Sequence, residues 1–260
     1  MLETDHLLVE QRDNGALWLT LHRPEVLNAF SGELSVALAE RLEGAASDDE
    51  VRVVVVTGSG TAFSAGADIS GADAHERFDV RSLDAANRII RAVVACPKPV
   101  VAAVNGVAAG VGCSTALAAD LVVAAESSTF LLAFARIGLM PDGGTSVTVA
   151  AAIGRARAMR MALLGEPLTA REAFDAGLVS HLAADEEFPA TVERLVGRLT
   201  RGAPLAQAAT KKAVNAATLH QLEPALERER TGQTILLRTA DAAEGMRAFN
   251  AGRRAEFRGD

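Results

Sequence analysis

The chain has 260 residues, 49% hydrophobic and 23% charged, which are ordinary values for a globular protein and exclude a disordered chain. Its length fits one large domain, or one domain with a short appendage, that folds without disulfide or metal support. The net charge of −7 argues against a nucleic-acid-binding protein. Aromatic residues make up only 4%, so we expect a core of Ala, Val, Leu and Ile.

The cysteines and the apolar segments predict a cytoplasmic protein without a membrane-spanning segment. Cys96 and Cys113 form no disulfide framework, and we expect both to be buried thiols in a reducing cytoplasm. The N-terminus, Met1–His6, is acidic and lacks the apolar core of a signal peptide. The uncharged stretch 99–119 is long enough to span a membrane, but it is rich in Ala, Gly and Val and also contains Asn, Ser and Thr. We therefore expect no membrane segment there, but a strand, a glycine turn and a buried helix.

The first hundred residues predict a hairpin, then helices separated by a buried strand. The turn signal Asp13–Gly15 lies between apolar runs at 7–10 and 16–21. Residues 51–57 (VRVVVVT) predict a strand buried on both faces. A glycine-rich loop follows over 58–71, and we expect the mostly polar segment 71–81 to be mobile. Two helices are predicted, one capped by Ser31 and ended by Gly44, the other from Ser82 to Cys96.

The rest of the chain predicts two more strands and then mainly helices, so the pattern is α/β giving way to α. The predicted strands cover 100–104 and 121–125, with a small-residue helix at about 110–119 between them. Thr169 and Glu172 form a capping-box pattern, and Gly177 ends that short helix. The other predicted helices cover 145–153 and 155–164, and later helices have Pro204 and Pro224 in their first turns.

Three kinds of site are excluded by spacing. The five histidines are scattered, without a Cys-x-x-Cys or His-x-x-x-His pair, so no metal site is expected. Gly58-x-Gly60 lacks the third glycine of a dinucleotide-binding loop, because Phe63 stands in its place. The segment Gly112–Ala116 begins like the nucleophile elbow of a serine hydrolase but lacks its final glycine.

Two glycine-rich loops remain, Phe63–Ile69 and Asn105–Gly112, each after a predicted buried strand. Their small side chains would let backbone N–H groups approach a ligand, and the second loop opens a helix. Two such N–H groups on one oxygen would form an oxyanion hole. For either loop alone, tight backbone packing at the ends of elements is the favoured explanation.

Several segments, taken in chain order, resemble the crotonase family, also called the enoyl-CoA hydratase/isomerase family. The likeness spans essentially the whole chain, and several independent motifs carry it at the family spacing. The matching segments are Leu21–Ala29 (LHRPEVLNA), Ser64–Ile69 (SAGADI), Lys98–Ala108 (KPVVAAVNGVA), Ile137–Gly144 (IGLMPDGG) and Leu168–Ala173 (LTAREA).

This resemblance implies an α/β fold, a spiral of ββα turns followed by a helical C-terminal segment that packs trimers, often paired into hexamers. It divides the chain into an acyl-CoA-binding core over 1–200 and an oligomerisation segment over 201–260. The implied substrate is an acyl-CoA thioester, with coenzyme A as part of the substrate and no separate cofactor, metal, nucleic acid or membrane.

The resemblance also implies roles for individual residues. The backbone N–H groups of Ala67 and Val111 would form the oxyanion hole, although the family usually has glycine at the second position. Phe249, Arg253 and Arg254 have an equally favoured alternative interpretation, in which they form an apolar helix face and a solvated basic tail. For Asp68 the favoured interpretation is that its carboxylate fixes its own loop. The implied substrate-path residues are Val26, Leu27, Ala65, Gly66, Asp68, Ile69, Gly110 and Phe134, and the implied CoA-binding residues are Arg23, Phe249, Arg253 and Arg254.

The chain departs from the hydratases of the family, which use two glutamates. Ser114 and Phe134 stand at those positions, so neither carries a carboxylate. The tract 134–144 resembles the isomerase branch, in which an acid directly after the proline shuttles a proton, and its likeness is greatest to the ring-epoxide and enoyl isomerases of phenylacetate breakdown. Here that acid is Asp142, and its apolar surroundings would raise its pKa toward that of a useful base.

We therefore expect an enoyl-CoA double-bond isomerase. Three alternatives remain open at the level of sequence. Asp142 could instead cap the helix that starts near Thr145, and the protein could be a hydratase or other thioester lyase that uses water differently. It could also be a non-catalytic CoA-thioester-binding homologue.

Overall fold

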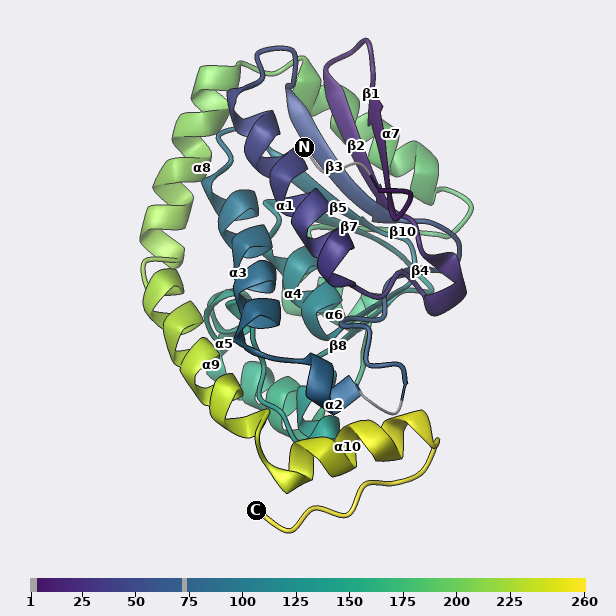
Figure 1. Ribbon diagram of the computed structural model, residues 1–260. Coiled ribbons are helices and arrows are strands. Elements are labelled where there is room, and N and C mark those ends of the chain that lie inside the picture. Colours follow the sequence, from purple (N-terminus) through teal and green to yellow (C-terminus); the bar gives the residue numbers. More distant parts are fainter. Residues whose placement is uncertain (1–3, 72–73) are drawn as a thin grey trace.

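The computed structural model describes residues 4–71 and 74–260, and its strands form two sheets (Figure 1). The larger sheet is parallel except for the hairpin pair β1–β2, and the smaller sheet is parallel except for β8–β9. The larger sheet has the order β1 (Leu7–Gln11), β2 (Ala16–Leu21), β3 (Val53–Gly58), β5 (Val100–Val104), β7 (Leu121–Ala125), β10 (His181–Ala183). The smaller has the order β4 (Ala62–Ser64), β6 (Val107–Ala109), β8 (Thr129–Leu131), β9 (Leu168–Thr169).

Strand β3 shows why the valine run forms the centre of the large sheet. Val54 and Val56 pack into the main hydrophobic core, whereas Val53 and Val55 pack into a second cluster on the opposite face, which includes residues of helix α7 (Phe188–Thr200). All four are buried, and β-branched side chains suit such a strand. The prediction of a strand buried on both faces is confirmed.

The repeating unit of the fold is a strand of the large sheet, a short strand of the small sheet and a helical segment. It occurs as β3–β4–α3 (α3, Val80–Ala95), β5–β6–α4 (α4, Gly110–Ala118) and β7–β8–α5 (α5, Thr145–Leu164). The ββα spiral and the α/β fold class are therefore confirmed. The pattern along the chain did not reveal the small sheet, because its strands have only two or three residues.

Two helix boundaries differ from expectation. Helix α1 (Gly32–Ser47) begins after the Ser31 cap as predicted but continues past Gly44, because an interior glycine costs only about 1 kcal/mol and Ala45 is buried beyond it. Helix α3 begins at Val80 rather than Ser82, since the Asp79 carboxylate accepts a hydrogen bond from the N–H of Arg81.

The expectation of a merely mobile segment over 71–81 was also incomplete. Residues 72–73 lie outside the described residues, but Ala74–Arg77 form the short helix α2. Ala74 is buried with Leu83 and Met246 in a small third cluster, so part of the polar segment is anchored by one apolar side chain.

The helical predictions for the second half are confirmed. Helix α5 is interrupted at Gly154, whose φ of +76° divides it where two helices were expected. The capping box is complete at the start of α6 (Ala170–Ala176): Thr169 Oγ1 accepts from the N–H of Glu172, and the Glu172 carboxylate accepts from the N–H of Thr169. Gly177 ends that helix with a φ of +84°.

The C-terminal segment is helical, as expected, and runs along one edge and one end of the molecule (Figure 1). Its helices are α8 (Pro204–Thr218), α9 (Leu222–Leu236) and α10 (Ala240–Asn250). Helix α9 packs against α3 and α5, and α10 packs against α2 and the 3-10 helix η2 (Ala133–Ile137). Within the described part of the chain, no helix is both long and apolar enough to cross a membrane.

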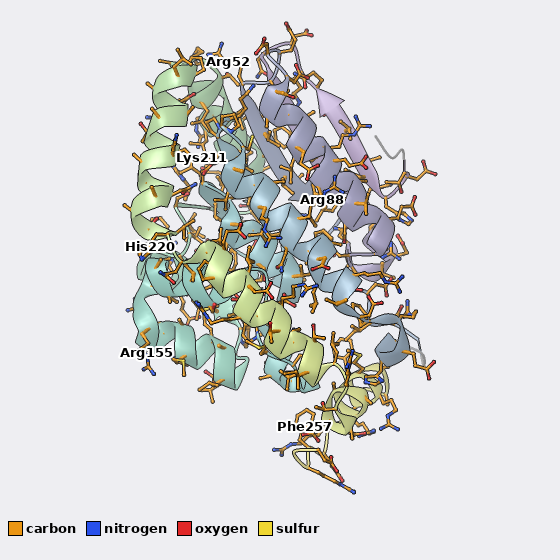
Figure 2. All side chains as sticks on the ribbon, turned by 60° about the vertical axis from the view of Figure 1, so that its left-hand side comes forward. Arg52, Arg88, Arg155, Lys211, His220 and Phe257 are labelled. Carbon is orange, nitrogen blue, oxygen red and sulfur yellow. The ribbon has the colours of Figure 1, made fainter. Side chains whose placement is uncertain are left out.

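Helix α8 is fastened to the core mainly through Lys211, which is labelled in Figure 2. Its ammonium group lies 2.8 Å from the Asp120 carboxylate and donates to the carbonyl oxygens of Val93 and Lys98. Burial raises the pKa of Asp120, although Lys211 opposes that shift. Phe257, in contrast, lies in the tail beyond α10 (Figure 2).

Candidate active site

The first glycine-rich loop follows β4 and is held against Phe30. Phe30 N–H donates to the carbonyl of Gly66 (2.7 Å), and Asp68 N–H donates to the carbonyl of Phe30 (3.1 Å). In this parallel bridge the N–H of Ala67 lies between the bonded groups, and no acceptor is found for it within the described residues. That N–H is therefore available to a ligand, as the resemblance implied.

The second loop leads directly from β6 into α4 and lies beside the first. Val111 is the second residue of α4, so its N–H belongs to the first turn and has no acceptor within the helix. Gly66 has a φ of +98°, and a Cβ there would lie 2.8 Å from the carbonyl oxygen of Ala109 and 3.5 Å from the Cα of Gly110. The two backbones meet at these glycines, because no side chain fits between them.

The valine at position 111 does not disturb this arrangement. Its side chain is buried in the main core, while its backbone forms the first turn of a regular helix. The contact expected of this residue is made through its N–H, so the usual glycine is not required here.

Asp142 is a buried acid beside helix α4, which the second loop opens. Asp142 is 8% exposed, and its Oδ2 accepts a hydrogen bond from Gln233 Nε2 at 3.1 Å, whereas its buried Oδ1 has no hydrogen-bond partner among the residues that the structure describes. Burial raises the pKa of Asp142 to about 7; the hydrogen bond from Gln233 opposes the shift, and the negative charge of Glu229 adds to it. A carboxyl group with this pKa can accept and return a proton near neutral pH.

Ser114 connects Asp142 to the helix that carries Val111. Its hydroxyl lies 3.0 Å from the main-chain oxygen of Asp142 and 3.2 Å from that of Gly110, one turn earlier on α4. Gly143 packs so closely that a Cβ on it would lie 2.7 Å from Ser114 Cβ. Ser114 therefore helps to position the backbone of Asp142, and Gly143 is required at this close contact.

Phe134 occupies the other position at which hydratases have a glutamate. It is buried in the main core, and its ring edge (Cζ) lies 4.0 Å from the place of a Cβ on Gly110. Here the structure places an apolar wall beside the second loop and no carboxylate.

Asp142 does not cap α5. The residue before the helix is Gly144, and the cap is the buried carboxylate of Glu229, which accepts from the N–H groups of Gly144 (2.7 Å) and Ser146 (3.0 Å). Burial raises the pKa of Glu229, while the hydrogen bonds from Ser146 and Gly144 oppose that shift. The alternative that made Asp142 a helix cap is thus wrong, because the carboxyl group of Asp142 makes no capping hydrogen bond to α5.

Sequence reasoning missed Glu229 and Gln233, although a signal was present. Both lie on the stripe of α9 that faces the core, at helical spacing with apolar residues. Polar residues at core-facing positions of a helix need hydrogen-bond partners inside the protein. The polar residues at these positions of the helical pattern could therefore have been predicted to make such contacts. The buried residues of α9 are Leu222, Ala225, Leu226, Glu229 and Gln233.

Most of the predicted substrate-path residues lie around the first loop, whereas Gly110 and Phe134 lie at the second. Leu27 accepts a hydrogen bond through its carbonyl from Ala65 N–H (2.9 Å), so Val26 and Leu27 lie against that loop. The Arg23 guanidinium lies 2.9 Å from the Asp68 carboxylate and donates to the carbonyl of Ala29. Arg23, predicted to bind CoA, thus has a structural partner in Asp68.

Asp68 fits its alternative role, that of fixing the loop. Burial would raise its pKa, but hydrogen bonds from Ser70 and Arg23 outweigh it and hold the pKa below its usual value. Such a carboxylate stays ionised at neutral pH and is a poor base.

The structure does not place the predicted CoA-binding residues Phe249, Arg253 and Arg254 in contact with the loops, although their neighbour Asn250 does contact the first loop. Asn250 donates to the carbonyls of Ile69 (2.8 Å) and Gly71 (3.1 Å), which places the end of α10 beside the exit of the first loop. Phe249 is 63% exposed, and Arg253 is paired with Glu244. Arg254 is exposed beyond the helix, so the structure leaves the CoA-binding role of these residues as a prediction.

No group of three or more His, Cys, Asp or Glu side chains that could hold a metal ion occurs in the part of the chain the structure describes. The features of the site are thus two free backbone N–H groups at adjoining loops and one buried carboxyl group on the same α/β scaffold. This combination defines a class of proteins that can stabilise a negatively charged oxygen and move a proton.

Comparison with known proteins identifies the family. The family model described as "Enoyl-CoA hydratase/isomerase" matches residues 11–260, and the chain belongs to that family, which confirms the resemblance found in the sequence. Among its relatives, "1,2-epoxyphenylacetyl-CoA isomerase" from Escherichia coli is 38% identical over 252 residues, covering 95% of this chain and 96% of the relative.

Other similar proteins bear hydratase names. The "2,3-dehydroadipyl-CoA hydratase" of Escherichia coli is 36% identical, covering 97% of this chain and 98% of the relative. A crystal structure described as an enoyl-CoA hydratase from Mycobacterium avium subsp. paratuberculosis is 46% identical with a TM-score of 0.93, covering 98% and 100% of the two chains. The relatives thus carry both activities in their names.

Proposed function

We propose that this protein moves the double bond of an enoyl-CoA thioester from carbon 3 to carbon 2 through an enolate. The observation that carries the proposal is the environment of Asp142, a buried acid with a raised pKa and one unpartnered oxygen. The residues at the usual glutamate positions, Ser114 and Phe134, provide no second acid.

The proposed reaction needs a single carboxylate. The C–H bond at carbon 2 breaks, the proton goes to Asp142, and the electron pair moves into the thioester as an enolate. The N–H groups of Ala67 and Val111 would stabilise that oxyanion, each by about 3 kcal/mol. The O–H bond of the protonated Asp142 carboxyl then breaks, and its proton goes to carbon 4, where the electron pair of the former carbon 3–carbon 4 double bond forms the new C–H bond. The enolate pair shifts to form the double bond between carbons 2 and 3, the thioester carbonyl re-forms, and the Asp142 carboxylate is restored.

A direct assay tests this proposal. The protein would be incubated with matched 2-enoyl- and 3-enoyl-CoA thioesters, and the products resolved by mass spectrometry and NMR. We expect interconversion of the two without a change in mass. A gain of 18 mass units, the mass of one water, would instead support the second candidate, a hydratase, which the name of the 46% identical structure favours.

The protein should bind CoA thioesters more tightly than the corresponding free acids. The reason is that the two loops offer N–H groups to a thioester oxygen, and residues of both the core and α10 lie near the first loop. Calorimetry with acetoacetyl-CoA and with acetoacetate measures the difference. Equal affinity for the two, or no binding of either, would contradict the proposal.

The protein should also assemble with itself, as a trimer or a hexamer. Helix α8 contributes no buried residue to the described chain, and its Leu205 and Val214 are 85% and 54% exposed. Apolar side chains on such a helix favour burial against another subunit. Light scattering at micromolar concentration should give three or six times 27.0 kDa, and a monomer mass would refute the expectation.

A further inference from the structure

We propose that Gln233 is a positioning residue that selects Oδ1 of Asp142 as the oxygen that carries the proton. The inference rests on the proposed function, because it concerns how the acid of that reaction is held. It concerns a residue of α9, in the helical segment that sequence analysis assigned to oligomerisation.

The amide of Gln233 is buried, and its orientation is determined by one residue. Its Oε1 accepts from the N–H of Met140 (3.0 Å), while its Nε2 donates to the carbonyl of Met140 (2.8 Å). Because the backbone offers one donor and one acceptor, only one orientation of the amide satisfies both. The same Nε2 is then directed at Asp142 Oδ2, 3.1 Å away.

This contact makes the two carboxylate oxygens of Asp142 unequal. Oδ2 already accepts a hydrogen bond, whereas Oδ1 is buried without any partner. Burial of an acceptor without a hydrogen-bond partner destabilises the folded state, so its retention is informative. Oδ1 has its lone pairs free for a substrate C–H, and rotation of the carboxylate away from that position would break the bond to Gln233.

Helix α9 holds Gln233 in a fixed position relative to Met140 and Asp142. Gly232 lets the helix approach Met140 so closely that a Cβ there would lie 2.5 Å from the Met140 sulfur. One turn before Gln233, the Glu229 carboxylate holds the start of α5 through Gly144 and Ser146. The short segment between Met140 and Gly144 is therefore held by α9 on both sides of Asp142.

The hydrogen bond from Gln233 to Asp142 should affect the pH dependence of kcat/KM. Glu229 is the charged group that acts on Asp142, and it raises the pKa of that carboxyl, as burial does. Gln233 is the group that lowers it, by donating to the ionised form. Removing the donor should therefore shift the acid limb of kcat/KM, which reports the free enzyme, to higher pH.

The test compares Gln233→Met, which removes both donors, with Gln207→Met as a matched control. Gln207 lies on α8, where its Nε2 likewise donates to a backbone carbonyl, that of Leu199 (3.0 Å), away from Asp142. For Gln233→Met we expect kcat on a 3-enoyl-CoA to fall about 10- to 100-fold, as for a misplaced reacting group. KM should change little, and the acid limb should move upward. The control should keep the wild-type kcat and midpoint.

A second variant guards against simple misfolding. Gln233→Glu keeps the size of the side chain and an oxygen for Met140 N–H, but it lacks the N–H and places a negative charge beside Asp142. The acid limb should therefore move further upward than in Gln233→Met. Unchanged kcat and midpoint in either folded variant would overturn the positioning role.

Failure of the inference is distinguishable from failure of the proposed function. If Asp142→Asn is inactive while the Gln233 variants behave as wild type, only the role of Gln233 is wrong. If Asp142→Asn keeps wild-type turnover, the proposed proton shuttle itself is wrong.

Discussion

Asp142→Asn should reduce isomerisation of a 3-enoyl-CoA by about 100- to 10,000-fold, the usual contribution of a general base. The amide keeps the size of the side chain and can still accept from Gln233, but it cannot take up a proton. Thioester binding should be nearly unchanged, because the oxyanion-hole donors belong to other residues. Turnover and calorimetry on the same preparation measure both effects, with the exposed Asp175→Asn on α6 as a control.

The same substitution has a predictable effect on stability. The folded-state pKa of Asp142 lies near 7, above the unfolded value of about 4, so the folded chain binds the proton more tightly between these values. This carboxyl group therefore makes the wild type less stable as the pH rises from about 4 to 7. Asp142→Asn should lose that dependence and melt at or above the wild-type temperature at pH 8, and a lower melting temperature there would contradict this account.

Wild-type turnover in Asp142→Asn would remove this residue from the mechanism. None of the family's acid positions would then hold a working carboxylate, since Ser114 and Phe134 occupy the other two. Asp68 is a weak substitute, because Ser70 and Arg23 hold its pKa low. That result would mean that a base at none of these positions performs the observed turnover.

Gly66→Ala should reduce kcat by about 100-fold, the effect expected when reacting groups are displaced by about 1 Å. The added methyl would lie 2.8 Å from the carbonyl oxygen of Ala109, and the backbone has a φ of +98° that alanine rarely adopts. Relief of this contact separates the N–H of Ala67 from that of Val111, which the oxyanion needs together.

Gly32→Ala is the matched control. Gly32 opens α1, and a Cβ there would have no atom within 4 Å. Its kcat should equal that of the wild type. Melting curves would show whether Gly66→Ala is folded at the assay temperature, and a folded variant with wild-type kcat would rule out the arrangement of the two loops as an oxyanion hole.

The sequence predicted those features that depend on local patterns. The valine run Val53–Val56 indicated a buried strand, the Thr169–Glu172 pair a capping box, and both agree with the structure. Gly154 interrupts α5 between the two expected helices. Each of these features depends on an interaction between residues close together in the sequence. These are the alternation of side chains in the strand, the helix cap and the positive φ of a glycine.

The parts that were missed depend on contacts between distant segments. The strands β4 and β6 are three residues each and exist through pairing with each other, which no local pattern reveals. The partners of Asp142 are about ninety residues away on α9, so sequence reasoning found the acid but not what holds it. At the C-terminal end the sequence predicted Phe249, Arg253 and Arg254 as CoA-binding residues, whereas the contact with the first loop is made by Asn250, which was not predicted.

The attachment of Asp142 to α9 also bears on how this chain can be divided. A fragment ending at residue 200 would contain both glycine-rich loops and Asp142, yet it would lack Glu229 and Gln233. The start of α5 would lose its cap, and the Asp142 carboxyl group would lose the hydrogen bond that Gln233 donates. The core over 1–200 and the C-terminal helices over 201–260 are therefore not interchangeable modules. A chimera with the C-terminal helices of a relative would have to keep a glutamate at position 229 and a glutamine at position 233.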